Sequence, residues 1–279
     1  MTNQQICAIA NGSGSAGKTS TALSLASLHA QQCPGARTLL VDLDPQGNAT
    51  SGAGADTKRP GVSQAIAAAS ANNPRDWPDL SADDLRATLA PLMDRLIQPT
   101  EYGFDVLGSG TRAQLQYTVS SLSSVDQRSL LKLALAALPH QTIILDCHGD
   151  LGAMTQAALE AANAVIAVSV PASKEASGIP ELLAEVARLR SEGTSAAVVA
   201  ALVPTIVRSR EVIASRYMAA FEARWPDLLT SSVRSSTVVG QAAATRAPVV
   251  DAFPDHPITQ DYREVYMHLV KKGVLSCPK

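Results

Sequence analysis

The sequence is poor in aromatic residues, in charge of either sign and in long apolar runs. Phe, Trp and Tyr make up 4% of its 279 residues, charged residues make up 17%, and the formal net charge is −2. This composition lacks the strong excess of one charge sign that marks nucleic-acid proteins and acidic tails. The longest apolar stretch, residues 196–207, contains a proline and is shorter than the about 20 residues that a membrane-spanning helix needs. We therefore expect a soluble protein.

Cysteine is also sparse. Cys7, Cys33, Cys147 and Cys277 form no C-x-x-C pair and show no metal-ligand spacing. Cys7 and Cys147 lie within or at the end of apolar runs, where a thiol usually acts as a small core residue. The first apolar run begins a few residues after the N-terminus and leaves no room for a signal peptide. These features predict a cytoplasmic protein with reduced thiols.

Apolar segments of two kinds alternate along the chain. Short runs typical of buried strands occupy residues 6–10, 38–41, 104–107, 142–146, 164–170 and 197–203, with weaker candidates at 230–233 and 249–250. Helical spacing is found at 20–28, 63–71, 82–97, 130–138, 180–191 and 262–272, and one more helix ends near residue 225. This alternation predicts βαβ units. The expected fold is a single α/β domain over residues 1–279, with a doubly wound, mostly parallel sheet flanked by helices.

Residues 12–19, G-S-G-S-A-G-K-T, match the phosphate-binding loop pattern G-x-x-x-x-G-K-[ST] between a strand and a helix, the context of a P-loop NTPase fold. The glycines let backbone amides surround a phosphate, and the helix N-terminus adds partial positive charge. Lys18 can reach the β- and γ-phosphates, and the Thr19 hydroxyl can ligate Mg²⁺. The sequence therefore predicts a nucleoside triphosphate bound by Gly12, Ser13, Gly14, Ser15, Ala16, Gly17, Lys18, Thr19 and Ser20.

Three carboxylates follow predicted strands. Asp146 ends the most strand-like run, which is the Walker B arrangement, and we expect it to hold Mg²⁺ opposite Thr19. Asp42 and Asp44 are two residues apart and so share a face of their strand. We expect Asp44 to orient the attacking water and Asp42 to support the Mg²⁺ shell; the alternative for one of the pair is a cap on the following turn.

Residues 146–149 fit D-x-x-G, in which the Gly149 amide can sense a γ-phosphate. His148, inside this segment, is a candidate general base, although a single loop histidine is more often a bystander.

With these pieces in place, the sequence resembles the ParA/Soj/MinD group of P-loop ATPases. The most specific match is residues 39–52, L-L-V-D-L-D-P-Q-G-N-A-T-S-G, which is similar to the Walker A′ segment of that group. Asn11 and the strand before Asp146 also fit. The resemblance implies a slow ATPase that uses ATP and Mg²⁺ and forms an ATP-sandwich homodimer. It further implies binding to DNA without sequence preference, discharge by a ParB-like activator, and a role in plasmid or chromosome partition.

The sequence departs from the family pattern at two places, one that affects the expected dimer contact and one in the segment that follows Asp146. The loop lysine that reaches across the family dimer is Ser13 here, and the second loop glycine is Ser15. Lys174 is our candidate replacement; the alternative is an exposed lysine at a helix start. His148 and Gly149 stand where the family commonly has Pro-Pro. Cargo-positioning ATPases of the McdA type likewise resemble this family without the loop lysine.

The partners implied by the resemblance have weaker support in the residues. Residues 200–279 carry 10 Lys/Arg against 7 Asp/Glu, a net +3. The DNA-contact candidates are Arg208, Arg210, Arg234, Arg246, Lys271 and Lys272. The family places its adenine pocket near residues 205–210 and 234–237. A MinD-type membrane tail at 262–275 is conceivable, but packing against the domain explains its apolar stripe more simply.

The alternative functions are a cargo- or membrane-positioning ATPase and a metabolic P-loop enzyme. Residues 42–48 argue against the metabolic enzyme, as does the lack of an acceptor-binding motif. No arginine finger is recognisable, so we expect slow hydrolysis that a partner accelerates. We expect the protein in the cytoplasm, on the nucleoid when ATP is bound.

Overall fold

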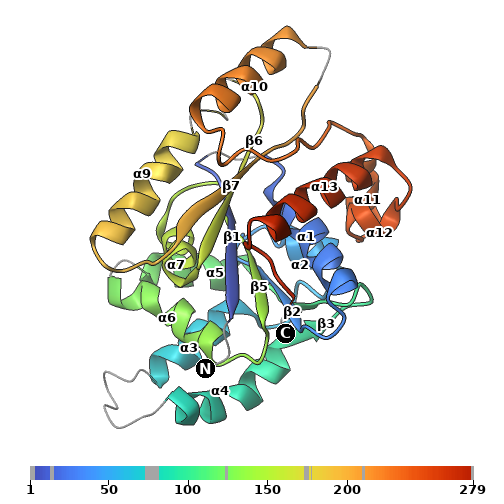
Figure 1. The fold of residues 1–279 in the computed structure, drawn as a ribbon. Helices are drawn as coiled ribbons and strands as arrows, with labels where there is room; N and C mark the ends of the chain where they lie inside the picture. Colours follow the sequence, from blue (N-terminus) through green and yellow to red (C-terminus); the bar gives the residue numbers. More distant parts are fainter. Residues whose placement is uncertain are drawn as a thin grey trace.

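The computed structural model describes residues 4–12, 16–72, 82–122, 125–172, 176, 178–208 and 211–277. Within these ranges, seven strands form one sheet in the order β3-β4-β2-β5-β1-β6-β7 (Figure 1). The strands are β1 (Gln5–Ala10), β2 (Thr38–Asp42), β3 (Ile97–Pro99), β4 (Asp105–Leu107), β5 (Thr142–Asp146), β6 (Ala164–Ser169) and β7 (Val198–Pro204). All neighbours pair in parallel except β3, which runs antiparallel to β4 at the sheet edge. The predicted fold class is confirmed.

Two layers of helices cover the sheet. One face carries α1 (Lys18–Gln32), α2 (Asn48–Gly52), α11 (Val238–Ala244), α12 (Val249–Ala252) and α13 (Pro257–Lys271) (Figure 1). The other carries α3 (Val62–Ala71), α4 (Ala82–Leu96), α5 (Arg112–Ser121), α6 (Val125–Ala136), α7 (Ala153–Ala161) and α9 (Gly178–Ser191). Helix α10 (Val212–Arg224) projects beyond the end of β7.

The central strands are buried on both faces, as their continuous apolar runs require. Side chains of β5 alternate between two cores: Ile143 and Leu145 pack in one, and Ile144 packs in the other. In β1, Ala8 and Ile9 divide in the same way. Because each strand contributes to both cores, the sheet cannot lose either helix layer without exposing apolar surface.

Two weak strand predictions are wrong. Residues 249–250 begin α12, directly after Pro248, whose fixed φ suits the entry to a helix. Residues 230–233 form no strand; isolated bridges at Leu229 and Arg234 flank them. Strand β3 and helices α2, α5, α7 and α11 were not predicted, because a three-residue edge strand and helices of ten residues or fewer give little periodic signal. None of the helices in the described ranges has both the length and the hydropathy needed to cross a bilayer.

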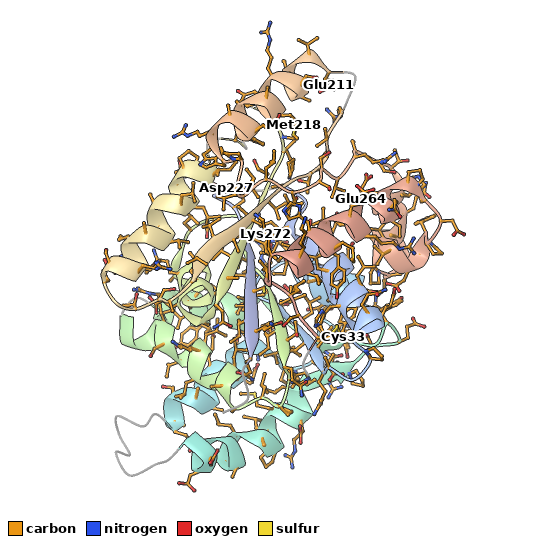
Figure 2. All side chains as sticks on the ribbon, viewed as in Figure 1. Cys33, Glu211, Met218, Asp227, Glu264 and Lys272 are labelled. Carbon is orange, nitrogen blue, oxygen red and sulfur yellow. A yellow bond between two sulfur atoms is a disulfide. The ribbon has the colours of Figure 1, made fainter. Side chains whose placement is uncertain are left out.

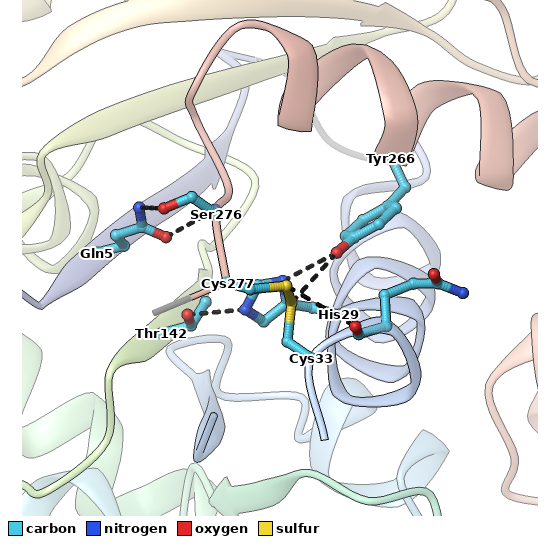
Figure 3. Close-up of a disulfide and its surroundings, with 8 residues drawn as sticks. Gln5, His29, Cys33, Thr142, Tyr266, Ser276 and Cys277 are labelled. Atoms are coloured by element: carbon cyan, nitrogen blue, oxygen red, sulfur yellow. Dashed lines mark hydrogen bonds between the residues drawn. A yellow bond between two sulfur atoms is a disulfide. The ribbon is translucent and has the colours of Figure 1, made fainter. Parts of the chain in front are cut away.

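The expectation that all cysteines are reduced is wrong for one pair. Cys33, at the end of α1, and Cys277, in the tail after α13, form a disulfide across 244 residues of sequence (Figure 3). Such a separation leaves no local spacing pattern, so only the fold reveals the pair. Cys7 and Cys147 are free and buried, as predicted.

Buried polar contacts surround the disulfide. The ring nitrogens of His29 lie 3.2 Å from the Tyr266 hydroxyl and 2.9 Å from the Thr142 hydroxyl (Figure 3). Burial lowers the pKa of His29 to about 4. Gln5 hydrogen-bonds both the backbone and the side chain of Ser276, which fixes the tail beside β1. The far end of α1 is therefore tied to both the sheet and the C-terminus.

We predict that reduction of this disulfide lowers the free energy of unfolding by about 2–4 kcal/mol, because it releases a long loop in the unfolded state. Denaturant titration with and without dithiothreitol measures the loss. The double variant Cys33→Ser/Cys277→Ser is the matched control and should no longer respond to the reductant. An equal response from the double variant would show that the effect comes from elsewhere.

Candidate nucleotide-binding site

The phosphate loop joins β1 to α1. Gly17 precedes α1 with φ of 76°, a left-handed conformation that favours glycine. At Gly12, a Cβ atom would lie 2.9 Å from the carbonyl oxygen of Gly178 at the start of α9, so the close approach of two backbones excludes a side chain. The Thr205 hydroxyl donates a 2.6 Å hydrogen bond to the Ala16 carbonyl and holds the loop against the end of β7. Residues Ser13, Gly14 and Ser15 lie outside the described residues.

Beyond the loop, the carboxyl ends of three adjacent strands meet. Asp146 of β5 is in register with Ile9 of β1 and with Asp42 of β2. The Thr19 hydroxyl donates a 2.8 Å hydrogen bond to Asp146 Oδ2. Lys18 is buried in the same region, and burial lowers its pKa while the Asp146 carboxylate acts in the opposite direction. The structure thus brings together the predicted Lys18, Thr19 and Asp146.

Asp146 fits a magnesium ligand. Its Oδ1 atom is buried and has no hydrogen-bond partner among the described residues. Burial, followed by the charge of Asp42, raises the pKa of Asp146 well above its usual range. A nearby cation would relieve both effects, and carboxylate and hydroxyl oxygens are the donors that Mg²⁺ prefers. Asp146 and Thr19 would therefore hold the ion.

Asp42 has a different environment from the neighbouring carboxylates. Its Oδ2 accepts hydrogen bonds from the backbone and the hydroxyl of Thr50, at 2.7 and 2.6 Å, and its Oδ1 accepts one from the Asp44 backbone at 3.1 Å. Both oxygens therefore hold the turn into α2, as the alternative role predicts. Complete burial nevertheless raises the pKa of Asp42 to about 6. Sequence reasoning missed Thr50, whose place in the residue 39–52 match was the available signal.

Asp44 lies further out at the same edge. Its Oδ1 accepts a 2.8 Å hydrogen bond from the Gln46 backbone and lies 3.3 Å from His148 Nδ1. Gly149 follows in the loop after β5 and is half-buried. The segment that follows β2 and the segment that follows β5 are therefore in contact through Asp44 and His148.

Two cavities adjoin this edge. One of about 300 Å³ lies between α1, α2 and α11, lined by Thr19, Ser20, Leu23, Asn48, Ser51, Gly52, Val239, Ala242, Ala243, Ala247 and Val249. Another, more open, involves the loops after β7 and before α11, where Val207 and Arg234 form a bridge. The structure thus joins the two loops that the family resemblance gives for adenine.

Several of the predicted DNA-contact residues have partners within the chain. Arg234 forms two hydrogen bonds to Asp261, at 2.6 and 2.7 Å. The Lys272 ammonium donates to the carbonyls of Ala200 and Asp227. Figure 2 labels Lys272 and Asp227 on the ribbon. The Arg246 guanidinium also donates to backbone carbonyls, those of Ser51 and Ala55. The Nη1 atom of Arg208 lies 3.4 Å from Glu211 Oε1. Lys271 is exposed, and Arg210 and Lys174 lie outside the described residues.

The glycine loop, the Lys18–Thr19–Asp146 cluster and the doubly wound sheet define a P-loop nucleoside triphosphatase. A family model described as an AAA domain (AAA_31) matches residues 4–198. The chain belongs to this family, within the ParA/Soj/MinD group of P-loop ATPases. Solved neighbours at under 25% identity include complexes with ATP, with ADP and magnesium, and with Mg-ADP.

The similar proteins include ones named for sporulation inhibition, chromosome partitioning and septum-site determination. The sporulation initiation inhibitor protein Soj of Bacillus subtilis is 33% identical over 164 residues, 58% of this chain and 56% of that protein. The chromosome partitioning protein ParA of Caulobacter vibrioides is 27% identical over 255 residues, 88% of this chain and 86% of that protein. The fold is similar to that of the ATP complex of Cyanothece McdA, with a TM-score of 0.77 at 18% identity and full coverage of both chains. MinD of Pyrococcus horikoshii with Mg-ADP gives 0.70 at 17% identity, with 97% of each chain covered.

The raised pKa of Asp42 predicts a pH dependence of stability. The folded protein binds this proton more tightly than the unfolded chain, so the stabilisation is full below about pH 4 and is lost as the pH rises through about 6. We expect the difference in unfolding free energy between wild type and Asp42→Asn to fall by up to about 3 kcal/mol from pH 4 to 8.

Denaturant titrations across this pH range measure that difference. Asp255→Asn, at an exposed carboxylate, is the matched control and should show a difference from wild type that changes little with pH. A flat profile for Asp42→Asn would contradict the expected protonation.

Proposed function

We propose that this chain is a slow ATPase whose ATP-bound form dimerises, binds DNA without sequence preference and is discharged by a ParB-like activator during plasmid or chromosome partition. The observation that carries the ATPase part is the buried, unpartnered Asp146 Oδ1 beside Thr19 and Lys18. A carboxylate with this burial is costly unless a cation joins it. Chromosome-partitioning names among the relatives support the wider role.

The residues divide the chemistry in the following way. Lys18 and the amides of the glycine loop would neutralise and position the phosphates, and a Mg²⁺ ion held by Thr19 and Asp146 would supply further charge stabilisation during phosphoryl transfer. Asp44 orients the attacking water, and Asp42 fixes Asp44 through its backbone amide. We expect the Gly149 amide to contact the γ-phosphate. No residue in the described ranges has been identified as an arginine finger, so we expect slow hydrolysis until a partner completes the site.

The adenine base would enter the region where the loops after β7 and before α11 meet. The backbone amide of Ser235 donates to the Val207 carbonyl at 3.0 Å, and that of Val207 donates to the Val233 carbonyl at 3.0 Å. These bonds keep the two loops at a fixed separation, as a base-binding slot requires. Thr205 connects the slot to the phosphate loop through Ala16.

A second candidate is an ATPase that positions a cargo other than DNA-bound plasmids. Two of the six DNA-contact candidates are paired with carboxylates, Arg234 with Asp261 and Arg208 with Glu211, which reduces the positive charge available to DNA phosphates. The replacement of the loop lysine by Ser13 also departs from the partition ATPases. A metabolic P-loop enzyme is less well supported, and turnover stimulated by a small acceptor molecule would be its signature.

Two variants should distinguish the residue that binds ATP from the residue that activates water for hydrolysis. Lys18→Ala removes the phosphate-binding cation and should weaken ATP binding more than tenfold, as loss of a charge-assisted hydrogen bond predicts. Asp44→Ala should bind ATP as wild type does but turn it over about 10²-fold more slowly, since only water activation is lost. Fluorescent-nucleotide titration and phosphate release measure these effects. Lys58→Ala, at an exposed lysine, is the control; unchanged ATP binding in Lys18→Ala would reject the site.

Sizing by light scattering tests the dimer. We expect a dimer with ATP and a monomer with ADP or no nucleotide, a longer-lived dimer in Asp44→Ala, and loss of the dimer in Lys174→Ala. A monomer under every condition would reject the ATP sandwich for this chain.

DNA binding measured on the same protein samples tests whether non-specific DNA is a partner. Lys271→Ala should reduce the slope of log affinity against log salt by about one, because one phosphate contact is lost. Lys58→Ala should leave the slope unchanged. A dimer that does not retain DNA with ATP would favour the cargo-positioning candidate.

A further inference from the structure

The imidazole of His148 lies between two carboxylates. Its Nδ1 is 3.3 Å from Asp44 Oδ1, and its Nε2 is 3.8 Å from Asp150 Oδ2. Nδ1 is buried, although the ring as a whole is partly exposed, and it makes no hydrogen bond with a described residue. A buried ring nitrogen without a hydrogen bond is costly, and its shortest approach to an acceptor is toward Asp44. A small rotation of either side chain would complete a charge-assisted hydrogen bond.

The two oxygens of Asp44 are in different environments. Oδ1 accepts the hydrogen bond from Gln46 and has His148 as a neighbour. Within the described part of the chain, Oδ2 has no hydrogen-bond donor. A second donor on Oδ1 would fix the rotation of the carboxylate about its last bond and leave Oδ2 directed away from the turn. That is the orientation in which a carboxylate can hold a water molecule.

Backbone hydrogen bonds hold the loop that carries His148. The backbone amide of Leu43 donates to the Asp146 carbonyl at 3.0 Å, and that of Cys147 donates to the Ile9 carbonyl at 3.2 Å, so the loop after β5 is tied to both neighbouring strands. Asp150 Oδ1 accepts a 2.9 Å hydrogen bond from the Gly152 amide at the start of α7. His148 thus lies between a carboxylate held by α7 and the carboxylate that follows β2.

We propose that His148 is a positioning residue for hydrolysis, which holds Asp44 through Nδ1 and links the turn after β2 to the loop after β5. The inference rests on the proposed ATPase function and on Asp44 as the water-orienting group. In this role His148 acts through Asp44 and not on the nucleotide, so its loss should slow the chemical step and leave ATP binding intact.

The test compares kcat and the ATP dissociation constant in three substitutions. His148→Ala should lower kcat about tenfold or more, the loss expected for one hydrogen bond to a charged group, with ATP binding within about twofold of wild type. His148→Asn should recover most of the rate, because its amide nitrogen occupies nearly the position of Nδ1. His148→Gln places its amide nitrogen near the position of Nε2 and should remain as slow as His148→Ala.

His268→Ala, a histidine on α13, is the matched control and should keep the wild-type kcat and ATP binding. Equal rates in wild type and His148→Ala would overturn the inference while leaving the ATPase in place. Equal recovery by Asn and Gln, or weaker ATP binding in parallel with the lower rate, would show a general structural role and would also overturn it. A wild type that binds ATP but does not hydrolyse it would reject the proposed function together with the inference.

Discussion

The site depends on one constraint, the burial of the Asp146 carboxylate where the carboxyl ends of β1, β5 and β2 meet. The hydrogen bond from Thr19 satisfies one of its oxygens, and the other has no partner among the described residues. Burial, followed by repulsion from the Asp42 carboxylate, raises the pKa of Asp146. This arrangement is unfavourable unless cations compensate for it; Lys18 supplies one positive charge nearby, and a Mg²⁺ ion bound with ATP would supply more. Stability and function oppose each other at this point, as they often do at active sites.

Contacts at both ends of α1 stabilise the helix that presents the phosphate loop, and they offset part of the unfavourable burial of Asp146. Helix α1 carries the phosphate loop at its N-terminus and the disulfide at its other end, about 20 Å away for a helix of its length. The disulfide and the contacts of His29 secure that far end against β5 and α13. At the near end, Thr205 holds the loop to β7. Lys18 and Thr19 are thus presented by a helix that is held at both ends, and we expect the segments after β2 and β5 to be the parts that respond to the nucleotide.

Those two segments differ in how firmly they are held. The turn after β2 is fixed through Asp42, whose two oxygens accept hydrogen bonds from Thr50 and from the Asp44 backbone. The contact between Asp44 and His148 is looser, because its 3.3 Å separation lacks a formed hydrogen bond. A contact of this kind can tighten when the γ-phosphate arrives and relax after hydrolysis, which is how P-loop switches transmit the state of the nucleotide. The hydrogen bonds of Asp42 hold the turn after β2 in place while the contact between Asp44 and His148 changes.

The sequence by itself determined the fold class, the loop at residues 12–19, the strand that ends at Asp146 and the carboxylates of the Walker A′ segment, because each depends on local order and spacing. Most strand and helix predictions were confirmed for the same reason. The tertiary structure alone decided that Asp42 holds a turn, that Arg234 and Lys272 are engaged within the chain, and that Cys33 pairs with Cys277. It also placed His148 beside Asp44. Each of these facts joins residues through space, and a contact between distant segments leaves no periodic signal in the sequence; even Asp42 and Thr50, eight residues apart, meet only because the chain turns into α2.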